Sequence, residues 1–167
     1  MYKPQYIDLG LPSGLLWSSD RVSLNDADAT DNFTYDEALL HFGDSLPHPE
    51  DYEELFSYCE IDWKKKLNGL EIVGPNGNSI FMPAGGFAFR CNESDLHSNS
   101  FVGYYWTCLD CSHGDAHDQT SAFCLAFDDF NQFVFDWSEL KSSFFPVFLI
   151  KHPHMNEVVD SSEQEGV

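Results

Sequence analysis

The sequence predicts an α+β domain, and three observations point to that class. Residues 49–59 repeat their apolar side chains at helical spacing, and residues 70–82 hold two apolar runs on either side of a turn signal. Between residues 101 and 150, nine of the fifteen phenylalanines are interleaved with polar residues, as in half-buried strands. We therefore expect two short helices, a mixed or antiparallel sheet, and long loops.

Two helices are expected in the first half of the chain. Pro49 fits a first helical position, and the acidic residues that follow it suit the positive end of the helix dipole. The earlier helix is expected over residues 35–42. Thr34 is a good N-cap, Glu37 would complete a capping box, and Gly43 would end the helix.

A β-hairpin is expected directly after the second helix. Asn76 and Gly77 separate the apolar runs 70–73 and 79–82. Because both central positions of a type I′ turn need a positive φ, this dipeptide predicts a type I′ hairpin. Pro83 would end the second strand, since proline cannot donate to the ladder.

Further strands and loops follow from the same patterns. Strands are expected at residues 6–9, 15–17, 87–90, 122–127, 133–135 and 146–150. Polar loops are expected at residues 25–32 and 91–100, and Gly85 with Gly86 should form a tight turn.

Length and charge limit the function classes. The 167 residues suffice for one domain, 1–151, with an acidic tail, 152–167. The net charge of −20 disfavours nucleic acid, which needs a basic patch. We read the basic cluster of residues 64–66 as a solvated loop. No apolar run suggests membrane insertion or a signal peptide, so we expect synthesis in the cytoplasm, with reduced thiols.

Three motifs carry a family resemblance. They are YIDLGLPSGLLW at residues 6–17, the stretch from LPHPEDYEELFSYC to GPNGNSIFMPAGG at 46–86, and GYYW at 103–106. In this order they resemble the major paralogous domain first named from Fibrobacter and abundant in Bacteroidetes and their phages. That family is similar to C-type lectin-like domains and to the formylglycine-generating enzymes.

The resemblance implies a C-type lectin-like fold in which the N-terminal strand pairs with the last one. Related lectin-like domains act as ligand-binding tips, including the variable proteins of diversity-generating retroelements. In those proteins the C-terminal segment is the diversified surface. Here the final third of the chain departs most from the family's usual sequence.

Several residue clusters could carry chemistry, and each has a simpler alternative. Cys108, Cys111, His113 and His117 have spacings that could wrap a zinc ion or merely form a variable loop. Asp26, Asp28 and Glu37 imitate part of a calcium loop, although the glycine such a loop needs is missing. No catalytic constellation stands out, and a formylglycine-generating-like enzyme remains a lesser alternative. We therefore expect no cofactor, no metal and no catalysis.

The aromatic and polar residues of the final third are the candidate binding surface. Large rings beside short polar groups give contact area at low entropic cost. The candidate residues are Tyr105, Asp110, His113, Phe130, Asn131, Phe133, Trp137 and Lys141. Trp106 and Phe148 are assigned to the core, and Phe130 is expected to be exposed.

Two hypotheses remain. The first is a non-enzymatic module that binds a protein or glycan on a cell surface, carried on a phage virion at the tail tip or capsid surface. The second is a structural protein that decorates a larger assembly and uses the same face as a subunit interface.

Overall fold

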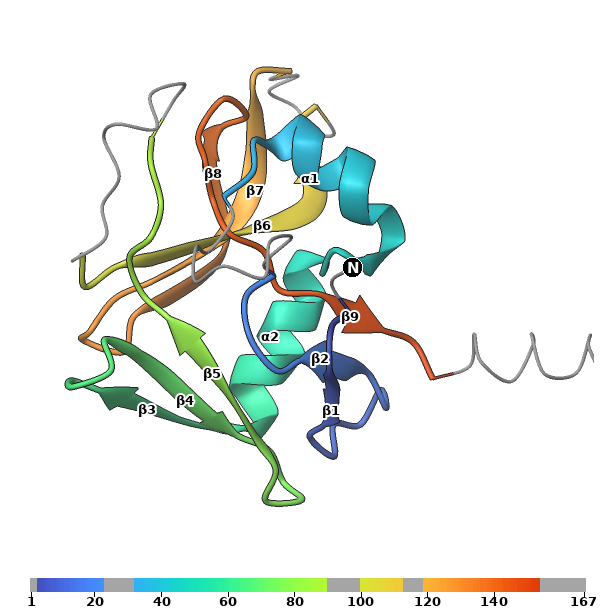
Figure 1. Cartoon of the computed structure of the whole chain (residues 1–167), viewed down its shortest axis with the longest axis vertical. Helices are drawn as coiled ribbons and strands as arrows, with labels where there is room; N and C mark the ends of the chain where they lie inside the picture. Colours follow the sequence, from blue (N-terminus) through green and yellow to red (C-terminus); the bar gives the residue numbers. More distant parts are fainter. Residues whose placement is uncertain (1–2, 23–31, 90–99, 113–118, 154–167) are drawn as a thin grey trace, which may run out of the picture.

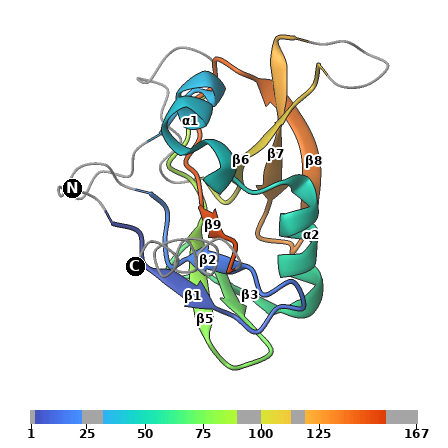
Figure 2. The ribbon, with the colours of Figure 1, turned by 90° about the vertical axis from the view of Figure 1, so that its right-hand side faces the viewer.

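A computed structural model describes residues 3–22, 32–89, 100–112 and 119–153. These residues form an α+β structure with two α-helices and three small antiparallel sheets. Figures 1 and 2 place the β6–β7–β8 sheet at one end of the molecule and the other two sheets at the opposite end. No helix in the described part of the chain is long and apolar enough to cross a membrane.

Both predicted helices are confirmed. Helix α1 spans Tyr35–Phe42, and the Thr34 side chain accepts a hydrogen bond from the Glu37 N–H. A short 3₁₀ helix, η1 (Gly43–Ser45), links it to α2 (Pro49–Tyr58). At the start of α2 the Asp51 carboxylate accepts a 2.8 Å hydrogen bond from the His48 N–H, which satisfies a backbone donor that the helix leaves unpaired.

The first sheet brings the two ends of the domain together. It consists of β1 (Tyr6–Asp8), β2 (Leu16–Ser18) and β9 (Ile150–Lys151), with β2 in the middle. The predicted pairing between the N-terminal and C-terminal strands is therefore confirmed.

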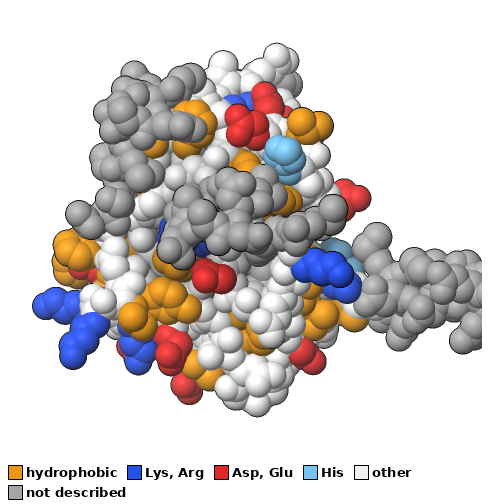
Figure 3. Space-filling model, in the orientation of Figure 1, with side chains coloured by type: hydrophobic (Ala, Val, Ile, Leu, Met, Phe, Trp, Pro, Cys, Tyr) orange, Lys and Arg blue, Asp and Glu red, His pale blue; other side chains and the backbone are white. Residues whose placement is uncertain are grey.

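The second sheet contains the predicted hairpin and one strand that the sequence analysis did not predict. Its strands are β3 (Glu60–Lys64), β4 (Gly69–Val73) and β5 (Ser79–Pro83). Lysines 64–66 lie at the end of β3 and in the turn that follows it, in the region where basic side chains gather at the lower left of Figure 3. Lys65 and Lys66 are exposed, as expected of a solvated loop.

The predicted type I′ turn is wrong, although the hairpin itself is right. Within this turn only Gly77 has a positive φ, of 90°, and the Gly77 N–H donates a hydrogen bond to the Gly74 carbonyl at 2.9 Å. The central residues of this turn are thus Pro75 and Asn76, and Gly77 follows in the left-handed region. Proline holds φ near −65°, which suits the first central position of a type I turn and excludes it from type I′.

The third sheet positions the candidate site. It consists of β6 (Gly103–Asp110), β7 (Ser121–Phe127) and β8 (Phe133–Leu140), in that order. One face packs Tyr105 and Leu125 against the core that contains α2. The opposite face packs Trp106 and Cys124 against a second core that contains α1 and the chain around Phe145.

Two predicted strands are wrong or shorter than expected. Among the described residues of 87–90, only Ala88 forms a bridge, to Phe144. Of residues 146–150 only Ile150 lies in a strand. Residues 144–149 instead fill the space between the sheets, where their apolar side chains form core contacts: Phe148 is fully buried, as is Trp106 on β6, and both predictions are confirmed.

Candidate ligand-binding groove

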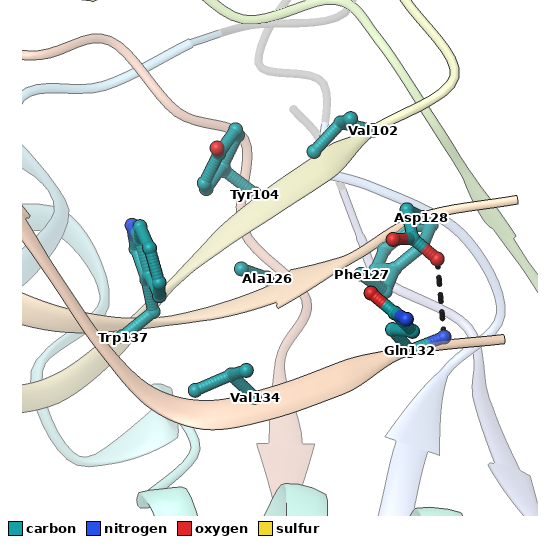
Figure 4. A pocket seen from close by; sticks show the side chains of 8 residues that line it. All are labelled: Val102, Tyr104, Ala126, Phe127, Asp128, Gln132, Val134 and Trp137. Carbon is teal, nitrogen blue, oxygen red and sulfur yellow. Dashed lines mark hydrogen bonds between the residues drawn. The ribbon is translucent and has the colours of Figure 1, made fainter. Parts of the chain in front are cut away.

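A groove lies on the face of the β6–β7–β8 sheet that carries Tyr104. It has a volume of about 260 Å³, and we call it the aromatic groove. Figure 4 shows that its side chains come from all three strands and from the turn between β7 and β8. They are Val102, Tyr104, Ala126, Phe127, Asp128, Gln132, Val134 and Trp137.

A β-bulge in β8 shapes this groove. Cys124 and Ala126, two residues apart on β7, pair with Trp137 and Val134, three residues apart on β8. The extra residue shifts the alternation of side chains along β8 by one position, so that Val134 and Trp137 point to the same side of the sheet. Without the bulge, side chains three apart on a strand would point to opposite faces.

The aromatic end of the groove, Tyr104 and Trp137, is positioned by contacts with neighbouring side chains. The Tyr104 ring stacks on Phe145, with centroids 5.1 Å apart, and meets Phe87 edge-on at 4.8 Å. The Trp137 indole Nε1–H donates a 3.0 Å hydrogen bond to the Glu139 carboxylate. Trp137 is 44% exposed, so its ring presents a large surface to solvent in a fixed orientation.

Burial raises the pKa of the Tyr104 hydroxyl, with a smaller contribution from the Glu139 carboxylate. The phenol is therefore neutral at physiological pH and can both donate and accept a hydrogen bond. A neutral hydroxyl beside an exposed indole offers a ligand one hydrogen-bonding group next to an apolar surface.

The polar end of the groove is a tight turn that Asp128 organises. The carboxylate oxygen Oδ1 accepts hydrogen bonds from the Phe130 N–H at 2.9 Å and from the Gln132 N–H at 3.1 Å (Figure 4 shows the second). Asn131 has a φ of 58°, which this residue type tolerates better than most. The turn thus fixes the Asp128 carboxylate opposite the two rings, and the Gln132 side chain lies beside it (Figure 4).

A second cleft lies on the other face of β8, against the start of α2. It has a volume of about 370 Å³, and we call it the acidic cleft. Its apolar side chains are Pro49, Leu109, Phe123 and Phe135, and its acidic ones are Glu50, Glu53 and Asp136. In a bulge the two adjacent residues turn to similar sides, which explains why Phe135 and Asp136 both line this cleft.

The structure divides the predicted binding residues into separate groups. Phe130, Asn131 and Trp137 lie on the β7–β8 hairpin, at or near the aromatic groove, and Phe130 is 80% exposed, as predicted. Asp110 and Lys141 lie at the opposite ends of the strands, beside α1. There the Lys141 ammonium lies 3.3 Å from the Asp110 carboxylate and over the Tyr35 ring.

Two predicted surface residues belong to the core instead. Tyr105 is fully buried, and its hydroxyl donates to the Pro83 carbonyl. Phe133 is half-buried, with its ring centroid 4.5 Å from that of Phe56 on α2. Both side chains point to the α2 face of the sheet because the two-residue period of a strand assigns them there. His113 lies outside the described residues.

Sequence reasoning missed most of the groove. Tyr104 and Tyr105 are adjacent in β6 and point to opposite faces of the sheet. An error of one position in the predicted alternation therefore exchanges the two rings. The core assignment of Trp106 could have indicated that Tyr104, two residues away, shares its face. The outward position of Trp137 follows from the bulge, for which the sequence gives no clear signal.

The possible zinc ligands cannot be compared as a set, because His113 and His117 lie outside the described residues. Within the described part no group of three or more His, Cys, Asp or Glu is arranged to hold a metal ion. Burial raises the pKa of the Cys108 thiol to about 11, so it is protonated at neutral pH. Asp26 and Asp28 of the possible calcium loop also lie outside, while Glu37 is exposed on α1.

In comparisons with protein-family models, curated proteins and solved structures, nothing matches this chain.

Proposed function

We propose that this protein is a non-enzymatic binding module on a C-type lectin-like scaffold, and that its ligand occupies the aromatic groove. The observation that carries the proposal is the exposed Trp137 ring, fixed by Glu139 and facing a carboxylate and a carboxamide across an apolar floor. Such a combination of rigid rings and short polar groups is typical of recognition sites for proteins and glycans.

The scaffold assignment draws on the motif resemblance and agrees with the α+β architecture. The paired terminal strands and the two helices before the main sheet are features that the lectin-like resemblance implies. In Figure 1 the turn between β7 and β8, which carries Asp128 and Gln132 of the groove, lies on the left of the molecule, whereas the sheet that pairs the terminal strands lies on the right. This separation would let a ligand reach the groove without contacting the paired terminal strands.

The test is a comparison of three proteins on two arrays, one of glycans and one of overlapping peptides from cell-surface proteins. Wild type should retain a ligand, and Trp137→Ala should bind it at least about tenfold more weakly. Tyr58→Ala, which removes another exposed ring on α2, should bind like wild type. Urea denaturation of each variant confirms folding. Equal binding by Trp137→Ala and wild type, or no ligand for wild type, would overturn the proposal.

A structural role is the second candidate, favoured by the exposed apolar residues of β8. Val134, Trp137 and Leu140 are 38%, 44% and 37% exposed and lie on one strand. If the exposed side chains of this strand join subunits, wild type should self-associate or join an assembly, and Trp137→Ala should not. Light scattering of both proteins across a concentration series distinguishes this role from ligand capture.

The setting we propose is the tail tip or capsid surface of a phage, and it rests on the family resemblance. Tail genes beside the coding sequence would support it. A neighbouring reverse transcriptase, with a near-identical copy that differs at codons for the final third, would extend it to a diversified protein. A locus with neither feature would count against both.

A further inference from the structure

Strand β8 is an open edge within the described part of the chain. It is the last strand of its sheet, and Figure 2 shows it along one side of the molecule. Asp136, Trp137 and Ser138 are exposed in succession, and no described strand pairs with the outer edge of β8. An unpaired edge presents N–H and C=O groups that can pair with another strand.

The sequence of β8, FVFDWSEL, contains no lysine, arginine or proline, and its two charged residues are Asp136 and Glu139. Lysine and proline are the residues that most often protect an edge. The bulge gives some protection, because it interrupts the ladder at Phe135 and Asp136. The half from Trp137 to Leu140 remains regular and is the part suited to pairing.

The two faces of β8 offer different chemistry. Val134 and Trp137 line the aromatic groove on one face, while Phe135 and Asp136 line the acidic cleft on the other. A strand added beside β8 would direct successive side chains alternately to these two faces. Its residues should therefore alternate between two types.

Charge decides which residue type the acidic cleft accepts. Glu50, Glu53 and Asp136 are exposed, and no hydrogen bond or ion pair joins any of their three carboxylates to a described residue. The positive end of the α2 dipole explains the two glutamates but not Asp136, which the bulge of β8 directs to the same cleft. An arginine or lysine whose stem lies on Phe123 and Phe135 would complement all three carboxylates.

The same charges argue against a second copy of this chain as the occupant. Each copy would bring the same acids to the interface, and the net charge of −20 opposes self-association. Charge complementarity thus favours a basic partner.

We propose that β8 binds an extended segment of another polypeptide, which pairs with Trp137–Leu140 and alternates basic residues over the acidic cleft with apolar residues over the aromatic groove. The proposal rests on the proposed function, because it names the class of ligand that the groove face takes.

The probe is a fluorescein-labelled peptide of Arg-Val repeated four times, measured by fluorescence anisotropy against the full chain. Wild type should bind it, and the affinity should fall as salt is raised. A peptide with the same composition but with the four arginines in one block should bind at least about tenfold more weakly. So should a peptide N-methylated at every residue, which has no backbone N–H to donate to β8 from either edge.

A matched pair of charge variants separates the acidic cleft from general attraction to an acidic protein. The cleft variant is Glu50→Gln with Glu53→Gln and Asp136→Asn. The control variant is Asp36→Asn with Glu60→Gln and Glu71→Gln, which changes the net charge equally at other sites. The cleft variant should lose at least about tenfold in affinity and the control variant much less.

The outcomes separate this proposal from the proposed function. Equal binding by the two charge variants, or full binding of the N-methylated peptide, would overturn edge docking and leave groove binding to the array experiment. If Trp137→Ala keeps its array ligand, the proposed function fails, and the apolar half of this proposal fails with it. Loss of the peptide by the cleft variant would then show a basic ligand of the acidic cleft alone. Concentration-dependent dimers that the peptide fails to dissociate would overturn the proposal in favour of a second copy.

Discussion

Val134 and Trp137 line the same groove although they are three residues apart on one strand. In a regular strand this spacing would put the two side chains on opposite faces. The single extra residue in β8 brings them to one side and turns Asp136 to the other. One local irregularity therefore supplies both the outer wall of the aromatic groove and a carboxylate of the acidic cleft.

Deleting Asp136 tests this relationship. Removal of the extra residue should leave a regular strand in which Trp137 still faces the groove, two positions after Val134, and the free energy of unfolding should change by no more than about 1–2 kcal/mol. Urea denaturation measures the stability. Iodide quenching of tryptophan fluorescence, with and without Trp137→Phe, isolates the exposure of Trp137 among the four tryptophans. Deleting Ser138 instead should reverse the facing of Glu139 and Leu140 and destabilise the protein more. Equal effects of the two deletions would contradict the role of the bulge.

Local signals predicted much of the first half of the fold. The cap at Thr34 and the proline at Pro49 mark the helix starts that the structure shows. The Asn76-Gly77 signal located the hairpin but not its turn type, because Pro75 determines φ at a central position. Such features depend on neighbouring residues, which a sequence displays directly.

The candidate site was harder to predict because it depends on which face of the sheet each side chain points to. Tyr104 and Tyr105 are equivalent in composition, yet one lines the groove and the other lies in the core. Residues 144–149 are apolar enough for a strand, but their backbone hydrogen bonds go to several separate segments rather than to one partner strand. The face that a side chain occupies and the partner that a segment finds are set by tertiary packing, so a residue pattern alone does not determine them.

Trp106→Phe should destabilise the protein by about 1–3 kcal/mol. The Trp106 indole N–H donates a 2.8 Å hydrogen bond to the Phe33 carbonyl, and the residue is fully buried. Phenylalanine would leave that buried carbonyl without its donor and would also leave a gap. Urea denaturation at neutral pH measures the loss. Trp137→Phe, at an exposed position, is the matched control and should change stability by less than about 0.5 kcal/mol.

Gly74→Ala should destabilise the domain by about 1–3 kcal/mol, because a Cβ there would lie 2.1 Å from the Leu9 carbonyl oxygen. This close approach seats the β4–β5 hairpin against the loop after β1, where the Asn78 amide also donates to the Asp8 carbonyl at 2.9 Å. Thermal unfolding by calorimetry checks the effect. Ser79→Ala, at an exposed strand position, should be nearly neutral. A Gly74→Ala protein as stable as wild type would show that the two segments can separate.

Asp110 should make stability fall with acid. Hydrogen bonds from the Ser112 side chain, helped by the Ser112 N–H and by Lys141, lower the pKa of the carboxyl below 3.8. Because the folded state lowers this pKa, the contribution is complete above about pH 5 and is lost as the pH falls through the carboxyl range. The stability difference between wild type and Asp110→Asn should therefore shrink between pH 7 and pH 3 in urea titrations. Ser112→Ala should reduce the same pH dependence, and an unchanged dependence would contradict this assignment.

Cys59 and Cys108 should react slowly with iodoacetamide in the folded protein. Burial raises the pKa of both thiols to about 11, with Glu54 adding to the effect at Cys59 and Asp51 at Cys108. At pH 8 only about 0.1% of each would be the reactive thiolate, and the labelling rate should rise about tenfold per pH unit from pH 7 to pH 9. Peptide mapping by mass spectrometry follows each site, and labelling in urea gives the rate for the accessible thiol. A rate that is already constant above pH 7 would mean an activated thiolate, and would reopen the question of chemistry at the end of β6.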